Sequence, residues 1–429
     1  MTTAAVRGLS PVRHQLPNGA VALAQESPAT PAVTINATMH VGSVDEPPTM
    51  LGLSYFTSRL IDRGAGELDA DEIAEELEGR GVSLNIAATR HAISITATSL
   101  VEDFAAIVDI VSDIVCRPLF PEQQIELRRA EIITQLRQDE DNPAVRAVQA
   151  LFTLLYSEDH PYGRPPKGTI ASIERIDRDA LVRFHRGCFS PASLVVAAVG
   201  AIDPHAAIDR VTRAFGSFAA NGQPPFGQAS GSAALSNVTG PSHRCVSVIP
   251  MMAKSQADIA YGFVTITRTD PSYYAWWVMN TILGQYGLGG RLGDNIRERQ
   301  GMAYYAYSAF DPHVVPGPLM VRAGVDGANV DRAIAAIDEE IVRLATSGPE
   351  PREIEETQRY LIGSLPRMLE TNGGIASFLQ TAERFGLGAD YDKRLPGLVG
   401  SVTREAVHAA AASLSPDRAA VAIAGPYKS

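Results

Sequence analysis

An internal repeat constrains this chain more than any other feature, because a repeat determines how many similar folding units the sequence encodes. The dipeptide Ser190-Pro191 is followed by an apolar run that ends at Gly200. Half a chain later, Ser415-Pro416 is followed by a second apolar run that ends at Gly425. Both segments have the pattern of a buried strand that begins after a proline and closes at a glycine. The 429 residues therefore contain two similar parts, each long enough to bury its own core.

The expected secondary structure has the same order in both parts. Alternation of apolar and polar residues predicts antiparallel strands at 33–39 and 92–98, and helical periodicity predicts helices at 71–78, 101–115 and 330–344. Strands and helices interleave without the glycine-rich phosphate turns of a parallel sheet. The sequence therefore predicts an α+β fold of two homologous domains, each with a mostly antiparallel sheet covered by helices.

The domain boundaries follow from composition. Residues 219–243 are dense in Gly, Pro, Ser and Ala, which is typical of a linker. We therefore predict an N-terminal domain at 1–218, a linker at 219–243 and a C-terminal domain at 244–429.

The charge balance and the apolar runs exclude two classes of partner. The chain has 37 Lys and Arg against 48 Asp and Glu, and its formal net charge of −11 repels the phosphates of nucleic acids. The N-terminal residues lack the apolar core of a secretory signal, and runs such as 194–202 are far shorter than the about 20 residues that span a bilayer. We expect a cytoplasmic protein without a membrane segment.

The segment 51–60 carries a resemblance to a known family. It is similar to the zinc-binding helix of the pitrilysin-like, or inverzincin, peptidases, and the similarity extends over nearly the whole chain. In that family an H-x-x-E-H motif places two His on one helical face to bind zinc, while its Glu activates a water molecule. Those three positions are Tyr55, Ser58 and Arg59 here, and the family's third ligand, a Glu on a later helix, corresponds to Gln135.

These four replacements remove the chemistry of the motif. Neither Tyr nor Ser replaces a neutral imidazole, and a permanently charged Arg repels a dication. The sequence therefore predicts that this chain holds no metal and is not a peptidase on its own. Two interpretations remain for Tyr55, Ser58 and Arg59: they form a half-buried helix face, or Arg59 replaces the positive charge of the lost zinc.

A second motif lies in the C-terminal half. Arg297 and Tyr304 match the Arg/Tyr motif of the family, whose two side chains bind the substrate at the zinc centre of the opposite half. A guanidinium and a phenol can hydrogen-bond a peptide and stabilise a developing oxyanion. The alternative is an Arg favoured by a helix C-terminus and an aromatic that packs on a strand. Tyr305 and Tyr307 alternate to the other face of the predicted strand, and we expect them in the core.

The resemblance implies a non-catalytic subunit of a heterodimeric peptidase, similar to mitochondrial processing peptidase and with a fold of the LuxS-like metallohydrolase type. A homologous H-x-x-E-H subunit would supply zinc, this chain would supply Arg297 and Tyr304, and a peptide would be cleaved in an enclosed chamber. The alternative is a purely structural scaffold, like the core subunits of the respiratory bc complex. A scaffold has no reason to carry the Arg/Tyr pair.

Overall fold

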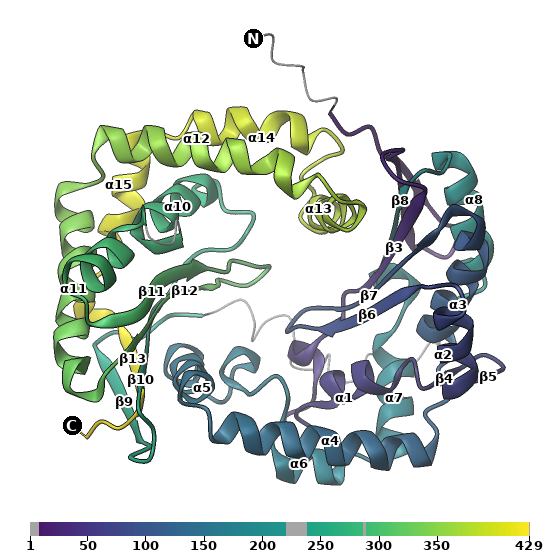
Figure 1. Ribbon diagram of the computed structural model, residues 1–429, viewed down its shortest axis with the longest axis horizontal. Helices are drawn as coiled ribbons and strands as arrows, with labels where there is room; N and C mark the ends of the chain where they lie inside the picture. The colour runs from purple at the N-terminus through teal and green to yellow at the C-terminus, as the bar shows by residue number, and fades with distance from the viewer. Residues whose placement is uncertain (1–7, 220–237, 286–288, 429) are drawn as a thin grey trace. The chain divides into compact units, whose positions relative to one another are not determined.

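The computed structural model describes residues 8–219, 238–285 and 289–428 and contains two compact units (Figure 1). The first unit consists of residues 1–136, 165–231 and 365–393, and the second of residues 137–164, 232–364 and 394–429. Each unit contains one large sheet with helices packed on it. The predicted α+β class with two similar, mostly antiparallel sheets is confirmed.

The sheet of the first unit has six strands. In spatial order they are β1 (Val12–Gln15), β2 (Val21–Glu26), β8 (Leu194–Gly200), β3 (Ala32–Met39), β7 (Ile93–Leu100) and β6 (Ser83–Ala88). Neighbouring strands are antiparallel except β2 and β8, which are parallel. One face of this sheet is apolar, and helices α3 (Phe104–Cys116) and α8 (Pro204–Phe215) pack on it.

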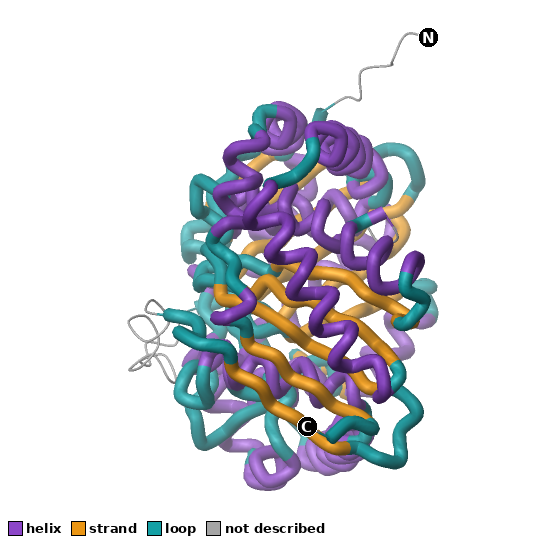
Figure 2. The backbone as a smooth tube through the Cα atoms, turned by 90° about the vertical axis from the view of Figure 1, so that its left-hand side faces the viewer, coloured by secondary structure: helices purple, strands orange, loops and turns teal. Residues whose placement is uncertain are grey.

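The sheet of the second unit has five strands, which lie side by side in Figure 2. In spatial order they are β11 (Ala303–Phe310), β12 (Pro318–Val325), β10 (Ala257–Val264), β13 (Ala420–Gly425) and β9 (Cys245–Pro250). Only the pair β13 and β9 is parallel among them. Helix α11 (Val330–Ser347) packs on one face, where the hydroxyl of Tyr261 donates a hydrogen bond of 2.9 Å to Asp338.

The duplication predicted from the sequence is visible at two glycines. A Cβ atom on Gly200 would lie 2.3 Å from the carbonyl oxygen of Ala32, the first residue of β3. A Cβ atom on Gly425 would lie 2.5 Å from the Cα atom of Ala257, the first residue of β10. Only glycine fits at either position, because the central strand of each sheet begins directly beside it.

One helix in each unit comes from the other half of the sequence. Helix α13 (Asn372–Arg384) packs on β3 and β8 of the first unit, and helix α5 (Pro143–Tyr156) packs on β9, β10 and β13 of the second. The compact units therefore differ from the predicted domains 1–218 and 244–429 by these exchanged segments. Residues 220–237 of the predicted linker lie outside the described residues.

The other helices complete the two units. They are α1 (Leu53–Leu60), α2 (Ala70–Glu78), α4 (Glu122–Glu140), α6 (Ile170–Arg175), α7 (Arg178–Cys188), α10 (Tyr273–Asn280), α12 (Pro351–Met368), α14 (Tyr391–Gly400) and α15 (Arg404–Ala412). Two π-helical segments, η5 (Thr281–Gln285) and η7 (Gly293–Arg299), precede β11. Within the described part of the chain, no helix is both long enough and apolar enough to span a membrane.

Candidate functional site

The start of helix α1 is fixed by a buried carboxylate. Glu46 is 4% exposed, and its two oxygens accept hydrogen bonds from the backbone N–H groups of Gly52 (2.8 Å) and Ser54 (2.7 Å). Gly52 has a φ of 87°, and a Cβ atom there would lie 2.5 Å from the carbonyl oxygen of Lys167. A negative charge at a helix N-terminus satisfies donors that lack an intrahelical partner. The sequence analysis missed Glu46, although an acidic residue shortly before a predicted helix is a recognisable signal.

The four positions that correspond to the family's zinc ligands and base do not form a metal site. Ser58 is 4% exposed and donates a hydrogen bond of 2.7 Å to the carbonyl oxygen of Tyr55 in its own helix. The ring of the half-buried Tyr55 lies 5.9 Å from the ammonium of Lys167, and Arg59 is exposed. Gln135 is half-buried on α4. No cluster of three or more His, Cys, Asp or Glu in the described ranges is placed to hold a metal ion.

Several arginines lie near α1. The guanidinium of Arg129 on α4 lies 5.4 Å from the centroid of the Phe56 ring on α1. Burial raises the pKa of the Asp62 carboxyl, while the positive charges of Arg63, Arg128 and Arg59 lower it. Zinc requires neutral imidazoles or anionic ligands, and positive charges oppose its binding. The residues present at this position therefore do not fit a zinc ion.

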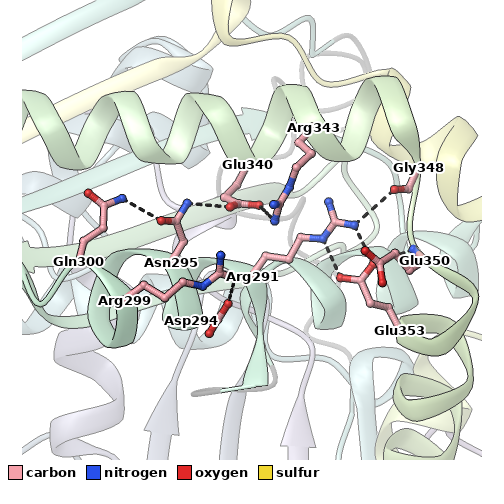
Figure 3. Close-up of polar contacts among 10 residues, drawn as sticks. All are labelled: Arg291, Asp294, Asn295, Arg299, Gln300, Glu340, Arg343, Gly348, Glu350 and Glu353. Carbon is pink, nitrogen blue, oxygen red and sulfur yellow. Dashed lines mark hydrogen bonds and ion pairs between the residues drawn. The ribbon is translucent and has the colours of Figure 1, made fainter.

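An ion pair between the buried Arg291 and the half-buried Glu353 holds the N-terminal side of the π-helical segment η7 in the second unit (Figure 3). The side chain of Arg291 is 8% exposed, and its Nε and Nη2 atoms each donate a hydrogen bond of 2.7 Å to the carboxylate of Glu353 on α12. Burial alone would raise the pKa of Glu353, but hydrogen bonds from Arg291 and from the N–H of Glu350 leave it lowered. The paired donors of an Arg fix orientation as well as distance.

A second buried carboxylate holds the body of the same segment (Figure 3). Glu340 on α11 is 1% exposed and accepts hydrogen bonds from Asn295 (2.7 Å) and Arg343 (2.5 Å). The amide of Gln300 donates a bond of 2.8 Å to the side-chain oxygen of Asn295, and Arg299 pairs with Asp294. A π-helical segment is uncommon and often occurs at functional sites. Here side chains of α11 and α12 hold the π-helical segment η7 in place, and we call these contacts its brace.

This braced segment presents Arg297, and the next strand presents Tyr304. The Arg297 side chain is 46% exposed, and its Nε lies 3.6 Å from a carboxylate oxygen of Glu298. Tyr304 is 83% exposed. In the pairing of β11 with β12, the register shifts between Ala303 and Tyr305, so Tyr304 is the extra residue of a β-bulge. Bulges redirect a side chain out of the ladder and are common beside active sites.

Tyr305 and Tyr307 differ from the prediction that they lie in the core. Both are half-buried, and their rings lie 5.7 Å apart. The hydroxyl of Tyr305 donates to Asp258, and the hydroxyl of Tyr307 accepts a bond of 3.2 Å from Arg322. Alternation along a strand predicts which face a side chain occupies, but not how deeply another element covers that face.

Two family models match most of this chain. Residues 21–165 match the model described as insulinase (peptidase family M16), and residues 175–361 match the model described as the peptidase M16 inactive domain. The chain belongs to the M16 peptidase family. The predicted resemblance to pitrilysin-like peptidases is therefore confirmed. The Arg/Tyr pair lies inside the part that matches the inactive-domain model.

Individual M16 relatives are similar over most of the chain. A protein of Streptomyces coelicolor named an uncharacterized zinc protease is 27% identical over 98% of this chain and 91% of its own length. A probable mitochondrial-processing peptidase subunit beta of Arabidopsis thaliana is 23% identical over 66% of this chain and 53% of its own. The crystal structure of a peptidase M16 inactive domain from Pseudomonas fluorescens has the same fold, with a TM-score of 0.87, 23% identity and coverage of 97% and 98% of the two chains.

Proposed function

We propose that this chain is the non-catalytic subunit of a heterodimeric zinc metallopeptidase that cleaves peptides in an enclosed chamber. The observation that carries the proposal is a contrast within one M16 chain. Tyr55, Ser58, Arg59 and Gln135 occupy the zinc-motif positions, while Arg297 and Tyr304 are exposed and available to a ligand. The partner in this proposal is a homologue with an intact H-x-x-E-H motif, which supplies the zinc.

Arg297 and Tyr304 have the chemistry for a role in peptide cleavage. Both donate hydrogen bonds, and a donor that is held in place before the reaction stabilises negative charge as it develops on a scissile carbonyl oxygen. The network of Glu340, Asn295, Arg291 and Glu353 supplies that rigidity for Arg297. The relative from Arabidopsis is itself named as a subunit, which supports an assembly of unlike chains. We propose a cytoplasmic location as well, which cell fractionation tests.

Co-expression with an H-x-x-E-H homologue from the same genome tests the proposal. We expect a stable complex that buries several thousand Å² in total, as obligate interfaces do. Elemental analysis is expected to find zinc in the complex and less than stoichiometric zinc in the isolated chain. A monomer at micromolar concentration in the presence of the partner, or about one tightly bound zinc per isolated chain, would contradict the proposal.

The complex then allows a test of the pair itself. If Tyr304→Phe and Arg297→Lys hydrolyse peptides like the parent complex, this chain acts as a scaffold and not as part of the active site. The triple change Tyr55→His, Ser58→Glu and Arg59→His provides a complementary test of the first unit. Because Gln135 still replaces the third ligand, this variant is expected to bind zinc weakly at best.

A further inference from the structure

One margin of the second sheet carries polar side chains that the proposed pair does not use. Helix α5 packs on β9, β10 and β13, so β11 and β12 form the margin of the same face. The strand register places Tyr307 beside Arg322 and Arg322 beside Ala260. It also places Tyr305 beside Gly324, and Gly324 beside Asp258. These two rows of residues lie next to each other on the sheet.

A glycine allows the first tyrosine to lie across β12. A Cβ atom on Gly324 would be 2.6 Å from Cε1 of Tyr305, so only glycine leaves room for this ring. The ring reaches over β12, and its hydroxyl donates to Asp258, which is 4% exposed. The amide of Gln256 donates a second bond of 3.3 Å to the same carboxylate. Both oxygens of Asp258 therefore have neutral donors on this face.

The second row holds a cation beside a pair of aromatic rings, whose centroids lie 5.7 Å apart. The guanidinium carbon of the half-buried Arg322 lies 5.9 Å from the centroid of the Tyr305 ring and 6.0 Å from that of Tyr307. Its Nη1 donates 3.2 Å to the Tyr307 hydroxyl, and its Nη2 donates a long bond of 3.4 Å to the carbonyl oxygen of Ala144. Both of these hydrogen-bond acceptors are uncharged. Among the described residues, no carboxylate is hydrogen-bonded to Arg322 to neutralise its positive charge.

We propose that Arg322, flanked by Tyr305 and Tyr307, binds a carboxylate of the peptide substrate. The forked donors of a guanidinium match the two oxygens of a carboxylate, and the adjacent rings attract the cation and limit its position on one side. This subsite lies on β11 and β12, the same pair of strands that presents Tyr304. The proposal rests on the proposed function in one respect, namely that the ligand is a peptide.

The ligand chemistry has two sources, an acidic side chain or the C-terminal carboxylate of the peptide. The net charge of −11 repels acidic peptides at long range, so any preference for them must arise at a local cation. If Arg322 is that cation, removing its charge is expected to abolish the preference for acidic peptides. It is also expected to weaken as salt concentration rises, because the site is partly open to solvent.

Fluorescence anisotropy with the full chain tests the proposal. One pair of short fluorescent peptides differs only by Asp or Asn at the central position, and a second pair only by a free or an amidated C-terminus. We expect one acidic form to bind about tenfold more tightly than its neutral match. Arg322→Gln is expected to reduce that ratio to about one, and Arg322→Lys to an intermediate value, because an ammonium lacks the fork.

The matched control is Arg332→Gln on α11, where the exposed guanidinium donates a hydrogen bond of 3.3 Å to the side chain of Asn329. This variant is expected to keep the full acidic preference. Equal affinity of the parent chain for both members of each pair, or no binding up to millimolar peptide, overturns the proposal. A preference for the acidic peptide that survives in both Arg322→Gln and Arg322→Lys also overturns the proposal. If Arg322→Gln does not fold, as judged by circular dichroism, the Arg322→Lys ratio decides.

The assay uses the isolated chain and needs no partner peptidase. It can therefore fail while Tyr304→Phe still lowers turnover in the heterodimer, in which case the proposed function stands without this subsite. Conversely, an acidic preference that depends on Arg322, with no effect of Tyr304→Phe on turnover, leaves a peptide-binding scaffold.

Discussion

The two units of this protein are built from one repeat, yet their polar side chains are used differently. In the first unit, the sheet face beneath α13 carries Thr34, Asn36 and Thr38, which hydrogen-bond to Thr98, Thr96 and Ser94 of β7 at 2.9–3.0 Å. In the second unit, the sheet face beneath α5 carries Asp258 on β10, Arg322 on β12, and Tyr305 and Tyr307 on β11. The first set is uncharged and satisfied internally, whereas the second includes a cation whose bonded partners are neutral. If Arg322 binds a carboxylate as proposed, one copy of the repeat uses this sheet face for internal packing and the other uses it to bind a ligand.

A pair of corresponding histidines shows how closely the repeat is kept and where it diverges. His185 on α7 lies with Nε2 2.8 Å from the carbonyl oxygen of Val115, at the end of α3. His408 on α15 lies with Nε2 2.9 Å from the carbonyl oxygen of Ala345, near the end of α11. His185 is 7% exposed, whereas His408 is half-buried. The same bond therefore operates in different environments.

The largest expected effect tests whether the second unit alone carries the site. In the reconstituted heterodimer, Tyr304→Phe and Arg297→Lys are each expected to lower peptide kcat by about 10²–10³, because a donor to the developing oxyanion is lost. Peptide hydrolysis under saturating substrate measures this. Ser58→Ala on α1 is expected to change kcat by less than about twofold. The same is expected of the matched controls Arg332→Lys on α11 and Tyr427→Phe, whose hydroxyl donates a hydrogen bond of 2.7 Å to Asp331. An equal loss in Ser58→Ala would remove the distinction between the units.

The next effect concerns acid stability, and it belongs to the first unit. Burial lowers the pKa of His185 to about 4 from an ordinary value near 6.5. The unfolded chain therefore takes up a proton at a higher pH than the folded chain does. This contribution, on the order of 3 kcal/mol, is complete above pH of about 6.5 and is lost as the pH falls towards 4. Circular dichroism melts between pH 7 and 4.5 are expected to show the loss.

His185→Gln checks the assignment of that acid effect. This variant is expected to be less stable at neutral pH and to lose less of its remaining stability on acidification. Both tryptophans of the chain, Trp276 and Trp277, lie on α10 of the second unit. Their fluorescence reports that unit, so a circular dichroism change without a tryptophan change locates the effect in the first. A change in tryptophan fluorescence at the same pH would assign the acid effect to the second unit.

The brace of η7 predicts a smaller effect in the second unit. Glu353→Gln leaves the guanidinium of the buried Arg291 without its charged partner and is expected to cost about 2 kcal/mol of unfolding free energy. Urea denaturation followed by tryptophan fluorescence measures this change. Glu356→Gln, in the same helix but paired with the 83% exposed Arg352 side chain, is the control and is expected to cost less than about 0.5 kcal/mol. Equal costs would show that the ion pair at η7 is not a brace.

The smallest expected effect compares two glutamines that each donate to backbone carbonyl groups. Gln380 on α13 is 7% exposed and bonds to the carbonyl oxygens of Asn36 and Val195, both at 2.9 Å. Gln358 on α12 is half-buried and donates to carbonyl groups at the end of α14. Gln380→Ala is expected to cost about 1 kcal/mol more than Gln358→Ala, because its acceptors are left unsatisfied in the interior. Urea denaturation followed by circular dichroism compares the two, and the reverse order would contradict the argument.

The sequence predicted the parts of the fold that depend on local pattern. The strand expected at 33–39 is β3 (Ala32–Met39), and the helix expected at 330–344 is α11 (Val330–Ser347). Each boundary differs by a few residues, since helix and strand ends depend on capping contacts. The positions of the zinc motif could be located in the sequence, because ligand chemistry depends on residue type at fixed spacing. That this chain holds no zinc stays a prediction.

Features that depend on distant contacts were not predictable. The periodicity of α5 and α13 shows that each helix has an apolar face, but not that this face packs on the sheet of the other half of the repeat. The β-bulge at Tyr304 follows from the pairing of β11 with β12 and leaves no signal in the strand pattern. An acidic residue before α1 is visible in the sequence, but its hydrogen bonds to Gly52 and Ser54 depend on how the chain turns back on the helix.

The exchange of α5 and α13 has a consequence for synthesis of the protein. When Gly200 leaves the ribosome, all six strands of the first sheet exist, but α13 has not yet been made. At about 5–20 residues per second, translation as far as Arg384 takes on the order of ten seconds or longer. During that delay Asn36 and the β8 backbone lack their cover, so the nascent first unit is open to chaperones and proteases until the second is nearly complete. Truncated chains that end before residue 372 are therefore expected to be degraded faster than the full chain.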